Sequence, residues 1–190
     1  MIRTTAPVVG PGAVVGELDG IAEAALEAFG PLSSGQLNWK PSAEQWSVGQ
    51  CLEHLIKTNE GFFKTLEAIA KGERRAGLWE RFSPLSGFFG WALLRGLSSD
   101  MKFKAPQSIR PEASGVGADI VARFVEHQGE LGRRLRAAEG VDTRRTVVTS
   151  PISGFVTYRF ADACRIVVAH ERRHLEQARR VTLEQGFPAA

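Results

Sequence analysis

The chain has 190 residues, of which 43% are apolar. This is enough for a single domain that buries about two-thirds of the surface its unfolded chain exposes. The net charge of +3 and the pI near 9.1 are only mildly basic, and acidic residues are interleaved with the basic ones. This balance, with no recognisable DNA- or RNA-reading motif, excludes a strongly cationic nucleic-acid-binding protein, and we expect no nucleic-acid partner.

The cysteines and the apolar segments indicate the compartment. Two cysteines, Cys51 and Cys164, cannot build a disulfide framework, which suits a reducing cytoplasm. Prolines and glycines interrupt residues 1–16, so this segment lacks the unbroken apolar core of a signal peptide. The longest apolar stretch, residues 85–94, is too short to span a bilayer. We therefore expect a cytoplasmic protein without a membrane partner.

Apolar residues at three- and four-residue spacing predict the first two helices. One is expected from about Val14 to Phe29, ended by Gly30 and Pro31, with residues 1–13 extended or flexible. The next begins after Ser47, because Ser47 and Gln50 form a capping-box pattern. It should run to about residue 71 and end at a glycine.

A long aromatic connection follows, over residues 73–111. Prolines and glycines interrupt it, so we expect one or two short helices rather than a long one. Its many aromatic residues, from Trp79 to Met101, favour an ordered segment over a disordered one. Two interpretations remain open: a lid that closes a binding site, or a cover that only completes the core.

The C-terminal half predicts two further helices, over about 114–138 and from 156 or 157 to 185, with a short extended piece at 146–149 between them. Four long helices without a convincing strand pair predict an all-α protein built as a four-helix bundle. We expect one domain over residues 1–190, with its core at about 14–186.

Three histidines carry the chemistry. His170 and His174 are four residues apart, so their rings project from one face of the last helix, about 40° apart. His54 lies next to the apolar stripe of the second helix. Imidazoles on core-facing stripes need a hydrogen bond, a charge partner or a metal. Together they predict a divalent transition-metal site, although an i, i+4 histidine pair is weakly specific.

The run His170-Glu-Arg-Arg-His174 also matches the H-E-x-x-H helix of zinc proteases. The extended form of that motif requires glycine and histidine where this chain has Gln177 and Arg180. The 16 residues after His174 leave little room for a ligand on another helix. These details disfavour a protease, and Glu171 is expected to be exposed or hydrogen-bonded nearby rather than a general base.

Several motifs together resemble the DinB-like superfamily over about residues 18–181. They are Trp39-Lys-Pro41, Trp46-Ser-Val-Gly-Gln-Cys-Leu-Glu-His54-Leu, Lys104-Ala-Pro106, Pro111, Ser150-Pro151, Tyr158 and His170-Glu-Arg-Arg-His174-Leu-Glu-Gln177. The resemblance implies a four-helix bundle of up-down-down-up topology, with a long crossover between helices two and three and frequent homodimers. It also implies a metal triad at His54, His170 and His174.

Three histidine ligands leave at least one metal position open for water or another ligand. Relatives in this superfamily include enzymes that use low-molecular-weight thiols. We therefore expect a metal-dependent enzyme, either a thiol S-transferase or a hydrolase, acting on a small-molecule ligand. The alternative is a non-catalytic, stress-associated metal-binding protein. Zinc and nickel are the favoured ions and iron remains open.

Four residues are secondary candidates. For His127 three roles are open: a fourth metal ligand, a hydrogen-bond partner of a bound small molecule, or a residue at the rim of the site. A cysteine in a position like that of Cys51 is more often a small buried side chain than a reactive thiol. Gln177 and Glu53 are candidates to fix the tautomer of a metal-binding imidazole.

Overall fold

A computed structural model describes residues 10–83, 85–99, 109–111 and 115–189. The elements, in chain order, are α1 (Pro11–Phe29), α2 (Ser34–Asn38), α3 (Val48–Ala70), α4 (Leu78–Phe82), α5 (Ser86–Leu97), α6 (Ile120–Ala137), β1 (Val147–Thr149), β2 (Thr157–Arg159) and α7 (Phe160–Thr182). The prediction of an all-α protein is confirmed.

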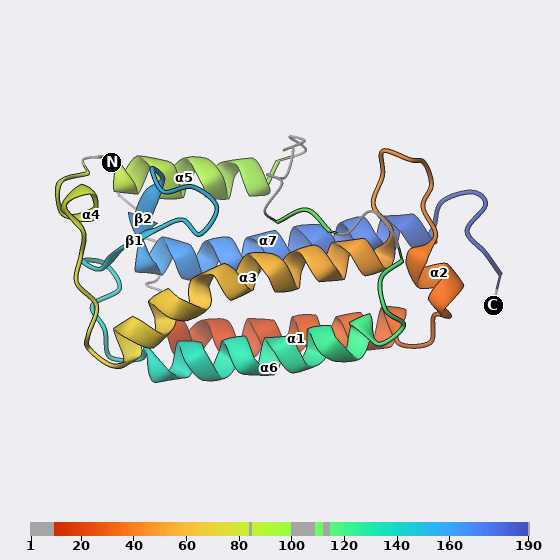
Figure 1. Cartoon of the computed structure of the whole chain (residues 1–190), viewed down its shortest axis with the longest axis horizontal. Helices are drawn as coiled ribbons and strands as arrows, with labels where there is room; N and C mark the ends of the chain where they lie inside the picture. Colours follow the sequence, from red (N-terminus) through yellow and green to blue (C-terminus); the bar gives the residue numbers. More distant parts are fainter. Residues whose placement is uncertain (1–9, 84, 100–108, 112–114, 190) are drawn as a thin grey trace, which may run out of the picture.

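The four long helices α1, α3, α6 and α7 lie side by side (Figure 1). Helices α1 and α7 run in one direction, and α3 and α6 in the other. Each of α1 and α3 packs against both α6 and α7. Their buried apolar faces form two core clusters, one around Leu52, Phe124 and Leu175 and one around Leu18 and Leu131.

The start of α3 is built as predicted. The Ser47 hydroxyl accepts a hydrogen bond from the Gln50 amide, and the Gln50 side chain accepts one from the Ser47 amide, both at 3.1 Å. This capping box satisfies donors that the first helical turn leaves unpaired. The helix ends at Ala70, close to Gly72, whose φ of +66° favours glycine. Together these ends fix where His54 lies along the helix.

Three helix starts differ from the prediction, those of α1, α6 and α7. Helix α1 begins at Pro11, three residues earlier than expected, because proline at the first helical position has no unpaired amide hydrogen. Helix α6 begins at Ile120, six residues later than expected. The Asn38 side chain accepts from the Val116 amide at 2.6 Å and donates to the Val116 carbonyl at 2.9 Å. These bonds take the backbone groups of Val116 away from a helix.

The last helix also starts later than expected, at Phe160, because residues 157–159 form a strand. Strand β2 pairs antiparallel with β1, with Val148 opposite Tyr158. The short extended piece was therefore predicted correctly at 147–149, and its partner strand was missed. Tyr158 is almost fully buried, so the pairing places an aromatic side chain in the core.

The long connection contains two short helices, as predicted. Helix α5 packs on the first half of α7 through small residues. A Cβ atom on Gly90 would lie 2.7 Å from Oδ2 of Asp162, so the close approach requires glycine. Four aromatic residues of α4 and α5 are exposed, namely Trp79, Phe82, Phe88 and Trp91, whereas Phe89 is partly buried. The prediction that this aromatic segment closes a pocket stays a prediction; Met101 lies outside the described residues.

In the part of the chain that the structure describes, none of the helices combines the length and the apolar character needed to cross a membrane.

Candidate metal centre

The structure brings together the three histidines that the sequence singled out. His54 projects from α3, and His170 and His174 project from successive turns of α7. One ligand nitrogen from each ring lies within 4.8 Å of the others. His54 is buried and the other two are partly exposed. The group could therefore hold a metal ion that is reachable from solvent.

The tautomer of His54 follows from its hydrogen bond. Nδ1 of His54 lies 2.7 Å from the carbonyl oxygen of Ile109, which can only accept, so Nδ1 carries the proton. Nε2 then bears the lone pair, and it lies 3.2 Å from Nε2 of His170. This pairing of a backbone carbonyl with the remote ring nitrogen is the usual support of a metal-binding imidazole.

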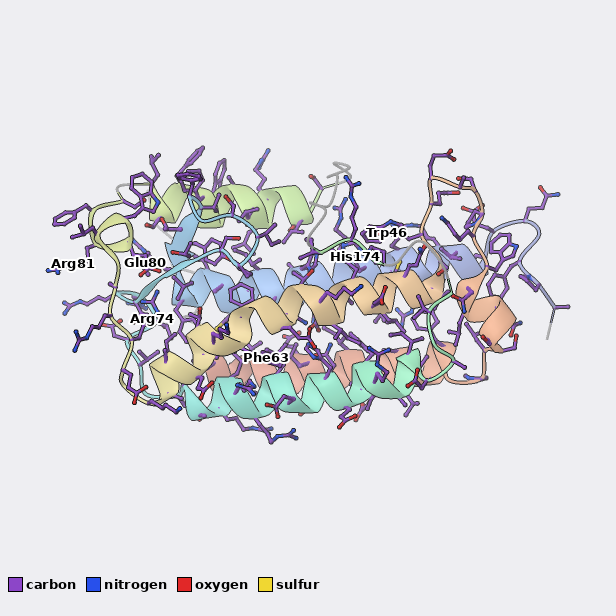
Figure 2. The ribbon with its side chains drawn as sticks, in the orientation of Figure 1. Trp46, Phe63, Arg74, Glu80, Arg81 and His174 are labelled. Carbon is purple, nitrogen blue, oxygen red and sulfur yellow. The ribbon has the colours of Figure 1, made fainter. Side chains whose placement is uncertain are left out.

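Trp46 forms one wall of the histidine group. Its ring stacks on His174 with centroids 5.6 Å apart and an angle of 22° between planes, and it lies 4.8 Å from the His54 ring (Figure 2). Trp46 directly precedes Ser47, the N-cap of α3. The capping box therefore also fixes the position of the Trp46 backbone relative to the helix. The indole limits rotation of both imidazoles.

Burial keeps all three imidazoles neutral. It lowers the pKa of His170 to about 3 and that of His174 to about 2, and the neighbouring histidines and Arg173 add to both shifts. Burial also lowers the pKa of His54, against the opposing effect of the Ile109 carbonyl. Neutral imidazole is the form that binds a metal, so the site needs no deprotonation at pH 7.

Gln177 lies beside His174 and acts weakly against the lowering of its pKa. Nδ1 of His174 is nevertheless buried without a hydrogen-bond partner. A buried nitrogen in this state is costly unless something outside the chain satisfies it.

Arg173 connects the histidine group to α5. Its guanidinium donates to the carbonyl oxygens of Leu97, at 3.2 Å, and Ser99. These bonds hold a positive charge next to His170 and His174, which contributes to their lowered pKa values. Among the described residues of the long connection, the C-terminal end of α5 and Ile109 reach the site.

Glu171 is fully buried, so the expectation that it is exposed or hydrogen-bonded nearby holds only in its second half. Its Oε1 accepts from the Asn59 amide at 2.7 Å and from the Gln128 amide at 3.0 Å. Burial raises the pKa of this carboxyl to about 7. Glu171 thus joins α3, α6 and α7 through a buried polar cluster, and its Oε2 has no partner there.

The secondary candidates lie in different surroundings. His127 stacks on Phe63 with ring centroids 5.3 Å apart and lies outside the histidine group, the one such group among the described residues. Cys51 belongs to the core, and burial raises the pKa of its thiol to about 12. Glu53 forms an ion pair with Lys57 at 3.2 Å.

A pH-dependent stability is expected from His127. Burial lowers its pKa from 6.5 to about 4. The unfolded chain therefore takes up the proton first, and the stability present above pH 6.5 is lost as the pH falls towards 4. Between pH 7 and pH 5, we expect the free energy of unfolding to fall by about 2 kcal/mol less in the His127→Phe variant than in the wild type. Urea unfolding of both proteins at the two pH values measures this difference, and parallel losses would contradict it.

Three contacts of the site were not predicted from the sequence. The Ile109 carbonyl belongs to the backbone, which carries no sequence signal. Trp46 belongs to a motif of the family resemblance, but its contact with the histidines was not predicted. Asn59 did leave a signal, since it stands at helical spacing between Leu55 and Phe62 on the buried face of α3.

Comparisons with known proteins agree with this geometry. The sequence model of the DinB superfamily matches residues 17–178, which includes all three histidines. The uncharacterized protein YuaE of Bacillus subtilis (strain 168) is 27% identical over 163 residues, covering 84% of this chain and 93% of YuaE. No solved structure shows a significant match. With its helical fold and a family match that spans most of the chain, the protein belongs to the DinB superfamily.

Proposed function

We propose that His54, His170 and His174 bind one divalent transition-metal ion, and that the protein is a metal-dependent enzyme. The observation that carries this proposal is the 3.2 Å separation of Nε2 of His54 from Nε2 of His170, with Nδ1 of His54 committed to Ile109. Two nitrogens bound to tetrahedral zinc at 2.0–2.1 Å lie about 3.3 Å apart. The two nitrogens are therefore spaced as two ligands of one zinc ion are.

The surroundings of the histidines support catalysis over a purely structural role. His170 and His174 are partly exposed, so a small molecule can reach the group. Three protein ligands leave a position for water or substrate. A divalent ion bound there would lower the pKa of a coordinated water molecule or stabilise a coordinated thiolate. Arg173 adds positive charge beside His170 and His174, which favours an anionic ligand there.

The cysteines bear on which reaction is used. Burial raises the pKa of both Cys51 and Cys164 to about 12, so neither supplies a thiolate at neutral pH. A thiol transferase of this construction needs a thiol cosubstrate from solution. We therefore favour transfer from a low-molecular-weight thiol to an electrophile, with metal-assisted hydrolysis as the second reaction that the same site supports.

The test is to incubate the zinc- or nickel-loaded protein with a panel of low-molecular-weight thiols and an electrophilic acceptor, beside protein-free controls. A parallel series without thiol contains ester and amide substrates. We expect a rate above background in one series that disappears in the His54→Ala variant and persists in His127→Phe. If no rate depends on the three histidines, the protein is instead a metal-binding protein in which the ion stabilises the fold.

A further inference from the structure

Large apolar side chains are exposed at one end of the molecule, far more densely than elsewhere. Of the ten large apolar residues that are exposed in the described chain, eight lie in or beside α4, α5 and the β1–β2 turn. We call these eight the aromatic surface: Leu78, Trp79, Phe82, Leu85, Phe88, Trp91, Ile152 and Phe155. Exposed fractions reach 72% for Phe82 and 80% for Phe155. Exposed apolar patches of this kind usually mark a binding surface.

Contacts between the three segments hold the aromatic surface together. The Trp79 indole N–H donates to the Phe155 carbonyl at 3.0 Å, which ties α4 to the β1–β2 turn. The Ser86 and Thr157 hydroxyls lie 3.0 Å apart, which ties α5 to β2. Figure 1 shows α4, α5 and the strand pair at the same end of the molecule. The exposed side chains therefore lie on neighbouring segments at this end of the molecule.

Helix α5 departs from the usual surface-helix pattern, because it exposes large aromatic residues although Leu93 packs partly buried against the core. Its buried residues are Ser86, Gly90 and Gly96, whereas Phe88 and Trp91 are each 57% exposed. An amphipathic helix on a globular protein normally turns its large apolar residues inward. A Cβ atom on Gly90 would lie 2.7 Å from Oδ2 and 3.0 Å from Cβ of Asp162, so a larger residue there requires Asp162 or α5 to shift. Glycine at this position therefore favours the observed orientation of α5, with Phe88 and Trp91 outward.

The charges on this surface are positive. Residues 75–99 and 147–159 contain four arginines and one acidic residue, Glu80, a net charge of +3. Glu80 is occupied, since it accepts from Arg74 at 2.6 Å and from Thr149 at 2.7 Å. Arg81 lies over the Phe82 ring at 6.0 Å, and Figure 2 shows it at the outer edge, with Glu80 nearer the helices. Arg95 lies over Trp91 at 5.8 Å.

We propose that the aromatic surface binds the surface of an anionic lipid bilayer. Aromatic and aliphatic side chains enter the boundary between headgroups and acyl chains, while neighbouring arginines contact lipid phosphates. Such binding needs no membrane-spanning helix, and it departs from the sequence-based expectation of no membrane partner, which rested on the lack of a spanning segment. A second copy using the same surface would set arginines against arginines, which disfavours self-association there. Nucleic acid would give the aliphatic Leu78, Leu85 and Ile152 no apolar partner.

Co-sedimentation with vesicles tests the proposal. The full-length protein is mixed with phosphatidylglycerol–phosphatidylcholine vesicles or with pure phosphatidylcholine vesicles, at low and at high salt. We expect binding to the anionic vesicles that weakens with salt, and little binding to the neutral ones. The Arg81→Gln/Arg95→Gln variant should bind about thirtyfold more weakly. The affinity of the Phe88→Ser/Trp91→Ser variant for the anionic vesicles should be lower by about tenfold or more.

The matched control removes two exposed leucines elsewhere, Leu26 and Leu183, by substitution with serine. This Leu26→Ser/Leu183→Ser variant should bind like the wild type. Circular dichroism melting checks that every variant is folded, which we expect because the replaced side chains are exposed. Equal binding to both vesicle types, or binding that neither surface variant weakens, would overturn the proposal.

Sedimentation velocity tests whether a second copy of the chain, rather than lipid, covers the aromatic surface. If the protein forms a dimer that Phe88→Ser/Trp91→Ser dissociates, the aromatic surface is an interface between copies and the lipid proposal is wrong. A homodimer built through another surface would survive this substitution and leave vesicle binding intact. None of these readouts depends on the metal, so failure here and failure of the proposed enzymatic function are distinguishable.

Discussion

Replacing Glu171 with alanine is expected to lower the free energy of unfolding by about 3–5 kcal/mol. The carboxylate accepts hydrogen bonds from Asn59 and Gln128, and all three side chains are buried. Alanine leaves both amides without an acceptor and opens a cavity between α3, α6 and α7. Chemical unfolding of the metal-free wild type and of Glu171→Ala measures the loss.

The Glu171→Gln variant is the matched control, and we expect it to stay within about 1 kcal/mol of the wild type. Glutamine keeps the volume and one acceptor oxygen, and its amide can donate where Gln128 Oε1 has no partner. If both variants lose the same stability, the hydrogen bonds to Asn59 and Gln128 are not what makes Glu171 important.

Divalent metal is expected to stabilise the wild-type protein strongly. A ligand that binds only the folded state adds about 2.7 kcal/mol when its free concentration is a hundredfold above Kd. For a chain of this length the melting temperature should rise by about 5–10 °C. Differential scanning calorimetry with and without zinc or nickel measures the shift.

The same scans on variants assign this shift to residues. His54→Ala should show almost no rise, because it removes the ligand that α3 contributes. His127→Phe should keep the full rise, since His127 lies outside the histidine group. A similar rise in His54→Ala and in the wild type would place the stabilising metal elsewhere on the protein.

Local signals in the sequence were sufficient for most of the helices. Regular apolar spacing and the Ser47–Gln50 capping box depend on neighbouring residues, so α3 was predicted almost to the residue. The boundaries that failed depend on distant contacts. Asn38 keeps Val116 out of α6, and β2 exists because β1 lies beside it. Neither contact can be seen in a window of the sequence.

Local signals also singled out the three histidines. His170 and His174 share a helix face by spacing alone, His54 lies next to the apolar stripe of the second helix, and the family resemblance implied the same three residues. Glu171 also stands at helical spacing on the buried face of α7, between Val167 and Leu175. Its charge argued for exposure, and the amides of Asn59 and Gln128 that make burial tolerable lie on two other helices.

The composition of the long connection did not predict how this segment packs. Aromatic residues such as Trp79 and Trp91 suggested a lid, because aromatic side chains usually become buried. The decisive residues are the small ones, since Gly90 allows α5 to approach α7 and leaves the large side chains outside. Among the described residues of the connection, Ile109 contacts His54 through its carbonyl, and the end of α5 holds Arg173 beside the other two histidines.

Elemental analysis of protein purified without a polyhistidine tag tests the central claim, the three-histidine metal site, most directly. We predict close to one equivalent of a divalent transition metal per chain in the wild type and in His127→Phe, and almost none in His54→Ala or His170→Ala. A wild-type protein that neither carries nor takes up such an ion, or a content that the histidine substitutions leave unchanged, would contradict the claim.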